Sequence, residues 1–252
     1  MTIDRPTTAL LPQLRQLWKE AFGDTDAFLD IFFHRAYAPE RSRCIIQDGQ
    51  VVAALYWFDC RWEHRRLAYF YAVATAKSCR GQGLCRILME DTHRHLRSSG
   101  YDGCILVPQE AGLYGMYGKF GYRTCSRSRE FSCTAGKEPI TLQQVTPSEY
   151  AAARRALLPE NAVVQEGVTL DFLSTYARLY TGPGIALAAY PNEEKLTVCE
   201  LLGAPETAPQ ILSALGFAQG TFRAPGSDAP FAMYLPLGND PAMPSYFGLA
   251  LD

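Results

Sequence analysis

Residues Tyr69 to Arg86 read YFYAVATAKSCRGQGLCR, and this stretch decides the fold. Its first part, Tyr69 to Thr75, is rich in aromatic and β-branched residues, which is typical of a buried strand. A polar segment with two glycines follows, and from Leu84 onward apolar residues recur at the spacing of one helix face. The order strand, glycine loop, helix places the unpaired N–H groups of a first helical turn beside a closely approachable backbone. Such an arrangement binds phosphate groups.

Three kinds of phosphate-binding loop share this order, and the spacing excludes two of them. A Walker loop requires Lys and then Ser or Thr directly after its last glycine, whereas Gly83 is followed by Leu84 and Cys85. A dinucleotide-binding loop requires a third glycine where Arg86 stands, and an acidic residue at the end of the next strand. Asp102 is at the wrong end for that role, because it precedes the next apolar run.

The segment that remains resembles the Arg/Gln-x-x-Gly-x-Gly/Ala signature of the GNAT (GCN5-related N-acetyltransferase) superfamily, whose loop holds the pyrophosphate of acetyl-coenzyme A. The last position differs, because Cys85 stands where the family has Gly or Ala. Cysteine is small and mildly apolar, so this change should cost little. The resemblance implies that the coenzyme is bound by Arg80, Gly81, Gln82, Gly83, Leu84 and Cys85.

A second resemblance lies in the segment LYGMYGKFGY, residues 113–122, which is similar to the Tyr-x-Lys-x-Gly-Phe/Tyr ending of the last helix in a GNAT domain. By this resemblance Tyr117 points at the coenzyme sulfur and donates a proton to it. The wider segment from Glu110 to Tyr122 looks most like the Eis-type (enhanced intracellular survival) branch, which acetylates amines. The spacing of Tyr114, Tyr117 and Phe120 would equally form a packing stripe on a helix.

The same resemblance assigns roles to the strand before the loop. It implies a splay in the sheet after Val73, so that the pantetheine arm pairs like an added strand with the main chain of Val73, Ala74 and Thr75. A Val73 amide would then polarise the thioester carbonyl.

The groups that would remove the proton of the amine are less defined. Eis-type enzymes resemble one another in using the chain's C-terminal carboxylate near the site, which here would be Asp252, with a frayed tail as the alternative. The general base itself stays open among three acids, each of which could as easily be a solvated surface residue: Asp59, Glu63 and Glu110.

Composition limits the class of protein. The chain has 252 residues, of which 48% are hydrophobic, enough for one large domain or two of ordinary size. A net charge of −2 gives no electrostatic case for nucleic-acid binding, which needs a concentrated basic face. No apolar run approaches the ~18 residues of a membrane span, and the amino terminus lacks a secretory signal pattern. We therefore expect a cytoplasmic protein that binds neither nucleic acid nor membrane.

Cysteine and histidine spacing predicts no metal site. The eight cysteines fall mostly in apolar runs and include no Cys-x-x-Cys pair, so neither a zinc site nor a disulfide framework is indicated. His93 and His95 lie two apart on a predicted helix and therefore face different sides.

The expected fold class is α/β with a mixed sheet of the α+β kind, the GNAT acyl-CoA N-acyltransferase fold, over residues 1–136. Asp24 is a candidate cap for a helix over 26–36, and Asp48-Gly49 is typical of a hairpin turn. The other elements are expected at residues 1–8, 9–22, 43–47, 51–58, 66–75, 83–98, 103–107, 110–122 and 129–133.

The stretch 137–145 is polar and reads as a linker to a second domain over 146–252. Helices are predicted there at 148–158, 170–180 and 208–215, and strands at 185–190, 196–202, 231–235 and 246–251. Gly203-Ala204-Pro205-Glu206 lacks the arginine and the paired glycines, so we expect a GNAT-like domain without coenzyme. An unrelated α+β domain is the alternative.

The resemblance implies an acetyl-CoA-dependent N-acetyltransferase that acts on a primary amine of a small molecule or peptide, by direct attack in a ternary complex. A non-catalytic module that only senses acetyl-CoA is the first alternative, and the joint presence of the loop and Tyr117 favours the enzyme. A second alternative keeps the fold but acylates an oxygen or carries a longer acyl chain. Assembly into a homo-oligomer is left open.

Overall fold

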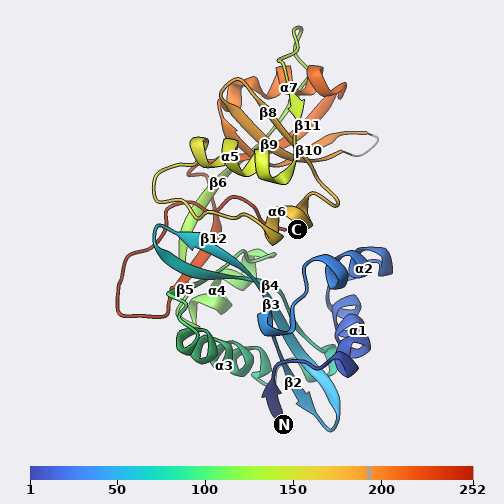
Figure 1. Cartoon of the computed structure of the whole chain (residues 1–252), viewed down its shortest axis with the longest axis vertical. Coiled ribbons are helices and arrows are strands. Elements are labelled where there is room, and N and C mark those ends of the chain that lie inside the picture. Colours follow the sequence, from blue (N-terminus) through green and yellow to red (C-terminus); the bar gives the residue numbers. More distant parts are fainter. Residues whose placement is uncertain (192–193, 252) are drawn as a thin grey trace. The chain divides into compact units, whose positions relative to one another are not determined.

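The computed structural model describes residues 1–191 and 194–251 and forms two units (Figure 1). The first unit comprises Met1–Cys60, His64–Tyr122 and Tyr234–Ala242, and the second comprises Arg61–Glu63, Arg123–Met233 and Met243–Asp252. This division differs from the expected domains 1–136 and 146–252. Strand β6, Arg123–Thr134, belongs to the second unit, and the residues of β12, Ala229–Pro236, are divided between the two.

The sheet of the first unit has the order β1-β2-β3-β4-β5, followed by the end of β12. Strands β2 and β3 form the antiparallel hairpin predicted around Asp48-Gly49, where both residues have positive φ, 50° and 77°. Strands β4 and β5 run parallel, and α3 makes the crossover between them. The bounds are β1 Thr2–Asp4, β2 Ser42–Gln47, β3 Gln50–Trp62, β4 Arg65–Thr75 and β5 Gly103–Leu106.

Helices cover both faces of this sheet (Figure 1). Helices α1, Leu11–Phe22, and α2, Asp26–Arg35, lie on one face, where Trp18 contacts the rings of Phe32 and Tyr71 at 4.5 and 5.6 Å between centroids. Helix α3, Leu84–Ser98, lies on the other, where His93 stacks on Phe70 at 5.7 Å. Because successive side chains of a strand point to opposite faces, β4 contacts both layers through Phe70 and Tyr71.

The cap of α2 differs from the prediction. Thr25, not Asp24, precedes the helix, and its hydroxyl accepts the Phe28 amide at 3.3 Å. Asp24 instead accepts the Trp18 indole N–H at 2.7 Å. The side chain of Asp24 is therefore used to hold the aromatic core of the unit.

The second unit repeats the strand-helix-strand crossover of the first. Its order is β12-β6-β11-β10-β9-β8-β7, and β10 and β11 run parallel with α7 between them. Its core contains apolar residues of α7 and of β8 to β11. The bounds are β7 Gln143–Gln144, α5 Pro147–Leu157, α6 Val168–Leu173, β8 Arg178–Gly182, β9 Ile185–Pro191, β10 Leu196–Gly203, α7 Ala208–Leu215 and β11 Gln219–Pro225.

Three sequence predictions for this unit were wrong. The helix expected over 170–180 ends at Leu173: residues 174–177 form a turn, and residues 178–180 pair with β9 as the start of strand β8. Strand β11 was not anticipated. The segment 246–251 is no strand: side chains satisfy its backbone, since Gln165 bonds both the N–H and the C=O of Leu249, at 3.2 and 2.7 Å.

The stretch expected as a linker runs along α7. The Ile140 amide donates to the Gln210 carbonyl at 3.4 Å, and the side chains of Ile140 and Leu142 pack against the core of the second unit. The stretch then forms β7 at the sheet edge.

A buried ion pair holds α5 against β10. Arg154 and Glu200 are each 1% exposed and make two hydrogen bonds, at 2.7 and 2.9 Å. The hydroxyls of Tyr150 and Tyr246 also donate to the Glu200 carboxylate, at 3.2 and 3.0 Å. Four hydrogen bonds thus offset the cost of burying the charges.

Candidate active site

Strand β4 carries a backbone distortion just before the expected coenzyme contacts. Ala72 has φ of 49°, a left-handed conformation that costs a non-glycine residue about 1–2 kcal/mol. The pairing with β5 runs from Leu67–Gly103 to Tyr69–Ile105, so Val73 and Thr75 lie beyond it. Both are partly exposed, while Ala74 between them is buried. The distortion lies one residue before the position at which a splay was expected.

The loop after β4 has the backbone that two glycines allow. Gly81 and Gly83 each have φ of 77°, and no atom lies within 4 Å of where a Cβ would stand on either. Gly83 is the N-cap residue of α3, and among the described residues no side chain caps this helix end. Leu84 turns its side chain into the core, and Gln82 is exposed. The first turn of α3 therefore has amides without a side-chain cap, next to two glycines whose side-chain positions are empty.

Arg80 stands at the entrance of the loop with an exposed side chain. Its Nε donates to the Thr75 carbonyl at 3.2 Å, which ties the loop back to the end of β4. The Ala76 amide donates to the Val52 carbonyl of β3 at 2.9 Å. The guanidinium is thus placed close to the loop while its remaining N–H groups can bind an anion.

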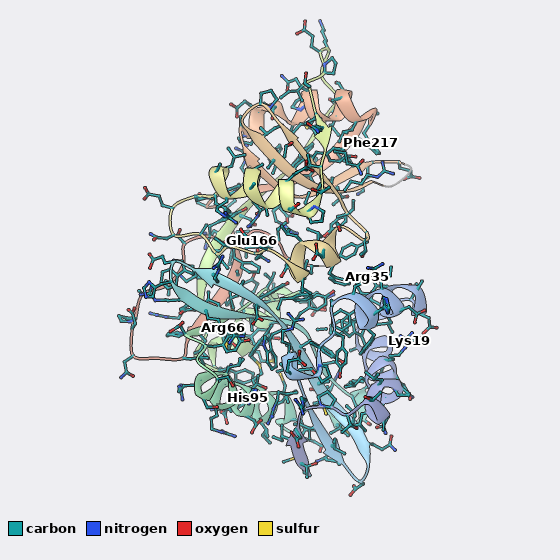
Figure 2. All side chains as sticks on the ribbon, viewed as in Figure 1. Lys19, Arg35, Arg66, His95, Glu166 and Phe217 are labelled. Carbon is teal, nitrogen blue, oxygen red and sulfur yellow. The ribbon has the colours of Figure 1, made fainter. Side chains whose placement is uncertain are left out.

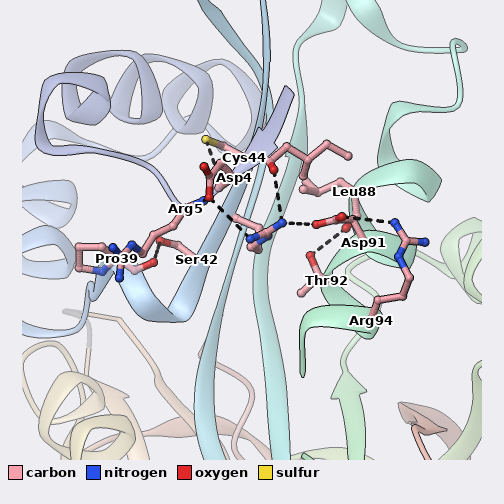
Figure 3. A network of polar contacts seen from close by, with 11 residues as sticks. Asp4, Arg5, Pro39, Ser42, Cys44, Leu88, Asp91, Thr92 and Arg94 are labelled. Atoms are coloured by element: carbon pink, nitrogen blue, oxygen red, sulfur yellow. Dashed lines mark hydrogen bonds and ion pairs between the residues drawn. The ribbon is translucent and has the colours of Figure 1, made fainter. Parts of the chain in front are cut away.

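Helix α3 is fixed to the sheet by charged residues (Figure 3). The Arg43 guanidinium of β2 donates to the Asp91 carboxylate of α3 and to the Ile3 carbonyl of β1, the latter at 3.4 Å. Asp91 also pairs with Arg94 at 3.3 Å. The Arg43 contacts therefore hold the helix whose N-terminus follows the glycine loop.

Tyr117 lies in α4, Ala111–Gly118, and is 7% exposed. Its ring contacts those of Phe120 and Tyr122 at 6.2 and 5.9 Å. Burial, and secondly the nearby thiol of Cys85, raises the pKa of the Tyr117 hydroxyl well above its usual value, so it stays protonated at neutral pH. Among the described residues this hydroxyl has no hydrogen-bond partner, and it can therefore donate to a ligand.

Cys85, at the position where the sequence departs from the expected signature, is partly buried beside this tyrosine. Burial raises the pKa of its thiol to about 11, so the thiol is neutral and a poor nucleophile at physiological pH. The departure therefore adds a small apolar group to the first turn of α3 and no charge.

A histidine that the sequence did not indicate as a site residue bonds Tyr122, whose ring contacts that of Tyr117. His93 makes a 2.9 Å hydrogen bond from Nε2 to the Tyr122 hydroxyl, and its ring is parallel to that of Phe70, at 5°. Burial, and secondly Arg97, lowers the pKa of His93 to about 4, although Glu90 opposes the shift. The imidazole is therefore neutral under physiological conditions.

This histidine predicts a pH dependence of stability. The folded state holds His93 neutral down to about pH 4, whereas the unfolded chain protonates it below its usual pKa of 6.5. Stability is therefore lost as the pH falls from 6.5 to 4, by about 2 kcal/mol at pH 5. Urea unfolding measures the free energy of unfolding at pH 7.5 and at pH 5. The loss between the two pH values should be about 2 kcal/mol smaller in His93→Gln, which keeps a polar partner for Tyr122, than in the parent. Equal losses in both proteins would contradict the assignment.

The three acids left open as bases differ in their contacts. Asp59 accepts the Tyr101 hydroxyl and pairs with Arg66 at 3.3 Å, and the Arg66 guanidinium, labelled in Figure 2, lies 3.9 Å from the centre of the Tyr101 ring. Glu63 and Glu110 are exposed. Asp252 lies outside the described residues. The base therefore stays open.

Metal-ligand clusters and helices able to span a membrane are both absent from the described residues. No group of three His, Cys, Asp or Glu side chains that could hold a metal ion occurs within residues 1–191 and 194–251. All eight cysteines are free thiols. Over the same part of the chain, every helix is too short or too polar to span a bilayer.

Comparisons with known proteins identify the same domain. Residues 2–125 match the family model of the acetyltransferase (GNAT) domain. None of the curated proteins compared with the chain matches it significantly.

Solved structures share the fold. A GCN5-related N-acetyltransferase from Anabaena variabilis superposes with a TM-score of 0.73 at 15% identity, over 94% of this chain and 73% of that one. Eis1 from Mycobacterium abscessus gives a TM-score of 0.68 at 12% identity, over 94% and 74%. A tandem GNAT protein from the clavulanic acid biosynthesis pathway gives 0.57 at 11%, over 95% and 99%.

The expected fold class, a GNAT fold followed by a second GNAT-like domain, is therefore confirmed. The expectation of an acyltransferase is confirmed at the level of the family, whose members use acyl-coenzyme A. The domain at residues 2–125 therefore belongs to the GNAT superfamily of acetyltransferases.

Proposed function

We propose that the protein is an acetyl-CoA-dependent N-acetyltransferase that acetylates a primary amine of a small molecule or peptide. One observation carries the proposal. The uncapped N-terminus of α3, with its two left-handed glycines, lies in the same unit as a protonated tyrosine hydroxyl that has no partner among the described residues. The first feature suits a pyrophosphate and the second suits a departing thiolate.

The residues of β4 and α3 would anchor the coenzyme. The amides of the segment from Gly81 to Cys85 would bind the pyrophosphate, with the Arg80 guanidinium adding charge. The main chain of Val73, Ala74 and Thr75 would pair with the pantetheine arm, because β4 continues there beyond its pairs with β5. This pairing would hold the thioester beside the Val73 amide, which would polarise its carbonyl.

The transfer would proceed in one ternary complex. The neutral amine attacks the thioester carbon, a C–N bond forms, and the C–S bond breaks. The electron pair of that bond goes to sulfur, which the Tyr117 hydroxyl protonates, and the amine proton leaves to a base or to water. Asp252 stays the candidate that family resemblance supplies for a carboxylate near the amine. A lysine-like amine has a pKa of ~10.4, so its deprotonation must accompany binding.

The alternative is a module that binds acetyl-CoA without turning it over. Binding alone would need the loop and no hydroxyl at position 117. The presence of a buried tyrosine whose hydroxyl makes no bond among the described residues favours the enzyme, since an unbonded, largely buried hydroxyl stabilises no fold by itself.

The test is a calorimetric titration with acetyl-CoA followed by a screen of amine acceptors, read by release of the coenzyme thiol. We expect one equivalent of coenzyme per chain, because Gly203–Glu206 offers the second unit no glycine loop, and Pro205 begins a short 3-10 turn there. At least one primary amine should give thiol release above hydrolysis. Binding without release for any amine would support the sensor, and no binding would refute both readings.

A further inference from the structure

The loop has a long-range contact that no sequence motif indicated. The backbone N–H of Lys77 donates to the carboxylate of Glu20, a residue of α1 that lies 57 positions earlier. Both residues belong to the first unit. Lys77 is the first residue of a 3-10 turn, Lys77–Cys79, that leads into the glycine loop. An N–H at that position has no partner inside its own turn, so Glu20 supplies the missing acceptor.

The other bonds of the turn are local. The Cys79 amide donates to the Ala76 carbonyl at 2.9 Å, and the Arg80 amide to the Lys77 carbonyl at 3.4 Å. These bonds shape the turn without fixing it to the helices. Gly81 and Gly83 follow, and glycine loses more conformational freedom on ordering than any other residue. A loop of this kind needs an external contact to keep one conformation.

The charges around Glu20 leave it available for this contact. Lys19 pairs with Asp26 at 2.8 Å, and Arg15 pairs with Asp30 at 2.8 Å, so the neighbouring cations of α1 are bound by α2. Glu20 is exposed and reaches the turn from the side of α1. Its negative charge would repel a pyrophosphate, so electrostatics alone would disfavour an acid at this place.

We propose that Glu20 is a positioning residue that holds the turn at Lys77, and with it the glycine loop, in the conformation that binds the coenzyme. The ligand in this statement rests on the proposed function. If only a fraction of the molecules have the loop in the binding conformation, the apparent affinity for the ligand falls by that fraction. A contact that fixes the loop therefore raises affinity without touching the ligand. The chemical step is not involved.

The experiment compares Glu20→Ala, Glu20→Gln and the control Asp30→Ala in the full chain. Glutamine keeps an oxygen that can accept the Lys77 N–H, and Asp30 is an exposed acid of α2 that pairs with Arg15 instead of the loop. Hydrogen exchange of residues 76–83 is measured in the free protein, relative to amides in the middle of α3. Affinity for acetyl-CoA is measured by calorimetry, and kcat and KM by thiol release.

In Glu20→Ala we expect exchange at 76–83 to accelerate at least fivefold, and coenzyme affinity to fall about fivefold to tenfold, which is about 1–1.4 kcal/mol. The kcat should stay within twofold while KM for acetyl-CoA rises. Glu20→Gln and Asp30→Ala should stay within twofold of the parent in exchange, affinity and kcat.

Two results would overturn the inference. Unchanged exchange in Glu20→Ala would mean that the contact does not order the loop. Equal or tighter coenzyme binding in both Glu20 variants would mean that the charge of Glu20, and not its hydrogen bond, is what the site senses. Should the parent fail to bind acetyl-CoA, the proposed function fails, while the exchange measurement still decides whether Glu20 positions the loop.

Discussion

Gly83→Asp is expected to lose at least 100-fold in affinity for acetyl-CoA while the protein stays folded. No atom lies within 4 Å of the new Cβ, so the free protein can accommodate the side chain. Its φ of 77° makes the substitution strained, by about 1–2 kcal/mol, although Asp tolerates this region better than most residues. The larger effect is on the ligand. A carboxylate ~5 Å from one phosphate charge costs about 1–3 kcal/mol at effective dielectric constants of ~80 to ~20, and a pyrophosphate carries more than one charge.

Calorimetry with acetyl-CoA and circular dichroism on the same samples test this result. Gly100→Asp is the matched control, because Gly100 has φ of 78° and equally open surroundings. It follows the far end of α3, whose 15 residues separate it from the loop by ~22 Å. Gly100→Asp should bind acetyl-CoA within twofold of the parent. An unaltered affinity in folded Gly83→Asp would show that the loop is not the pyrophosphate site.

Tyr117→Phe is expected to reduce turnover by about 100-fold with little change in coenzyme affinity or melting temperature. The ring contacts with Phe120 and Tyr122 are kept, because only the hydroxyl is removed. Loss of a general acid typically costs ~10² to 10⁴ in rate. The lower end is expected because burial raises the pKa of Tyr117 above that of a thiol, so proton transfer to the sulfur is uphill and speeds the reaction less than transfer from an acid of matched pKa would.

Turnover, coenzyme binding and melting temperature are all measured on this variant. Loss of an acid lowers turnover, loss of a coenzyme contact lowers binding, and loss of packing lowers the melting temperature. Tyr114→Phe is the matched control: it removes a tyrosine hydroxyl one turn earlier in the same helix. We expect its turnover to stay within threefold of the parent. Turnover of Tyr117→Phe within threefold of the parent would exclude the acid role, and a drop shared by both variants would point to the helix rather than to the hydroxyl.

Local sequence predicted the elements whose geometry depends on neighbouring residues. The Asp48-Gly49 hairpin and the strand, loop and helix around Gly83 were predicted correctly, because a left-handed turn residue and a change of apolar period are readable within about fifteen positions. The helix expected over 170–180 was wrong because it, too, was predicted from the local pattern alone. Its local pattern fits a helix, but pairing with β9 made its last residues, 178–180, part of a strand.

Taken alone, the sequence determined the family and the position of the loop and of Tyr117 in it, because paired glycines and a motif tyrosine are local features. The tertiary structure alone decided which distant residues hold the loop and the other segments of the fold in place. Glu20 reaches Lys77 across 57 residues, Glu200 is bound by Arg154 across 46, and Gln165 holds Leu249 across 84. Such contacts depend on which side chains the folded sheet and helices bring within hydrogen-bonding distance, and no periodicity along the chain encodes that distance.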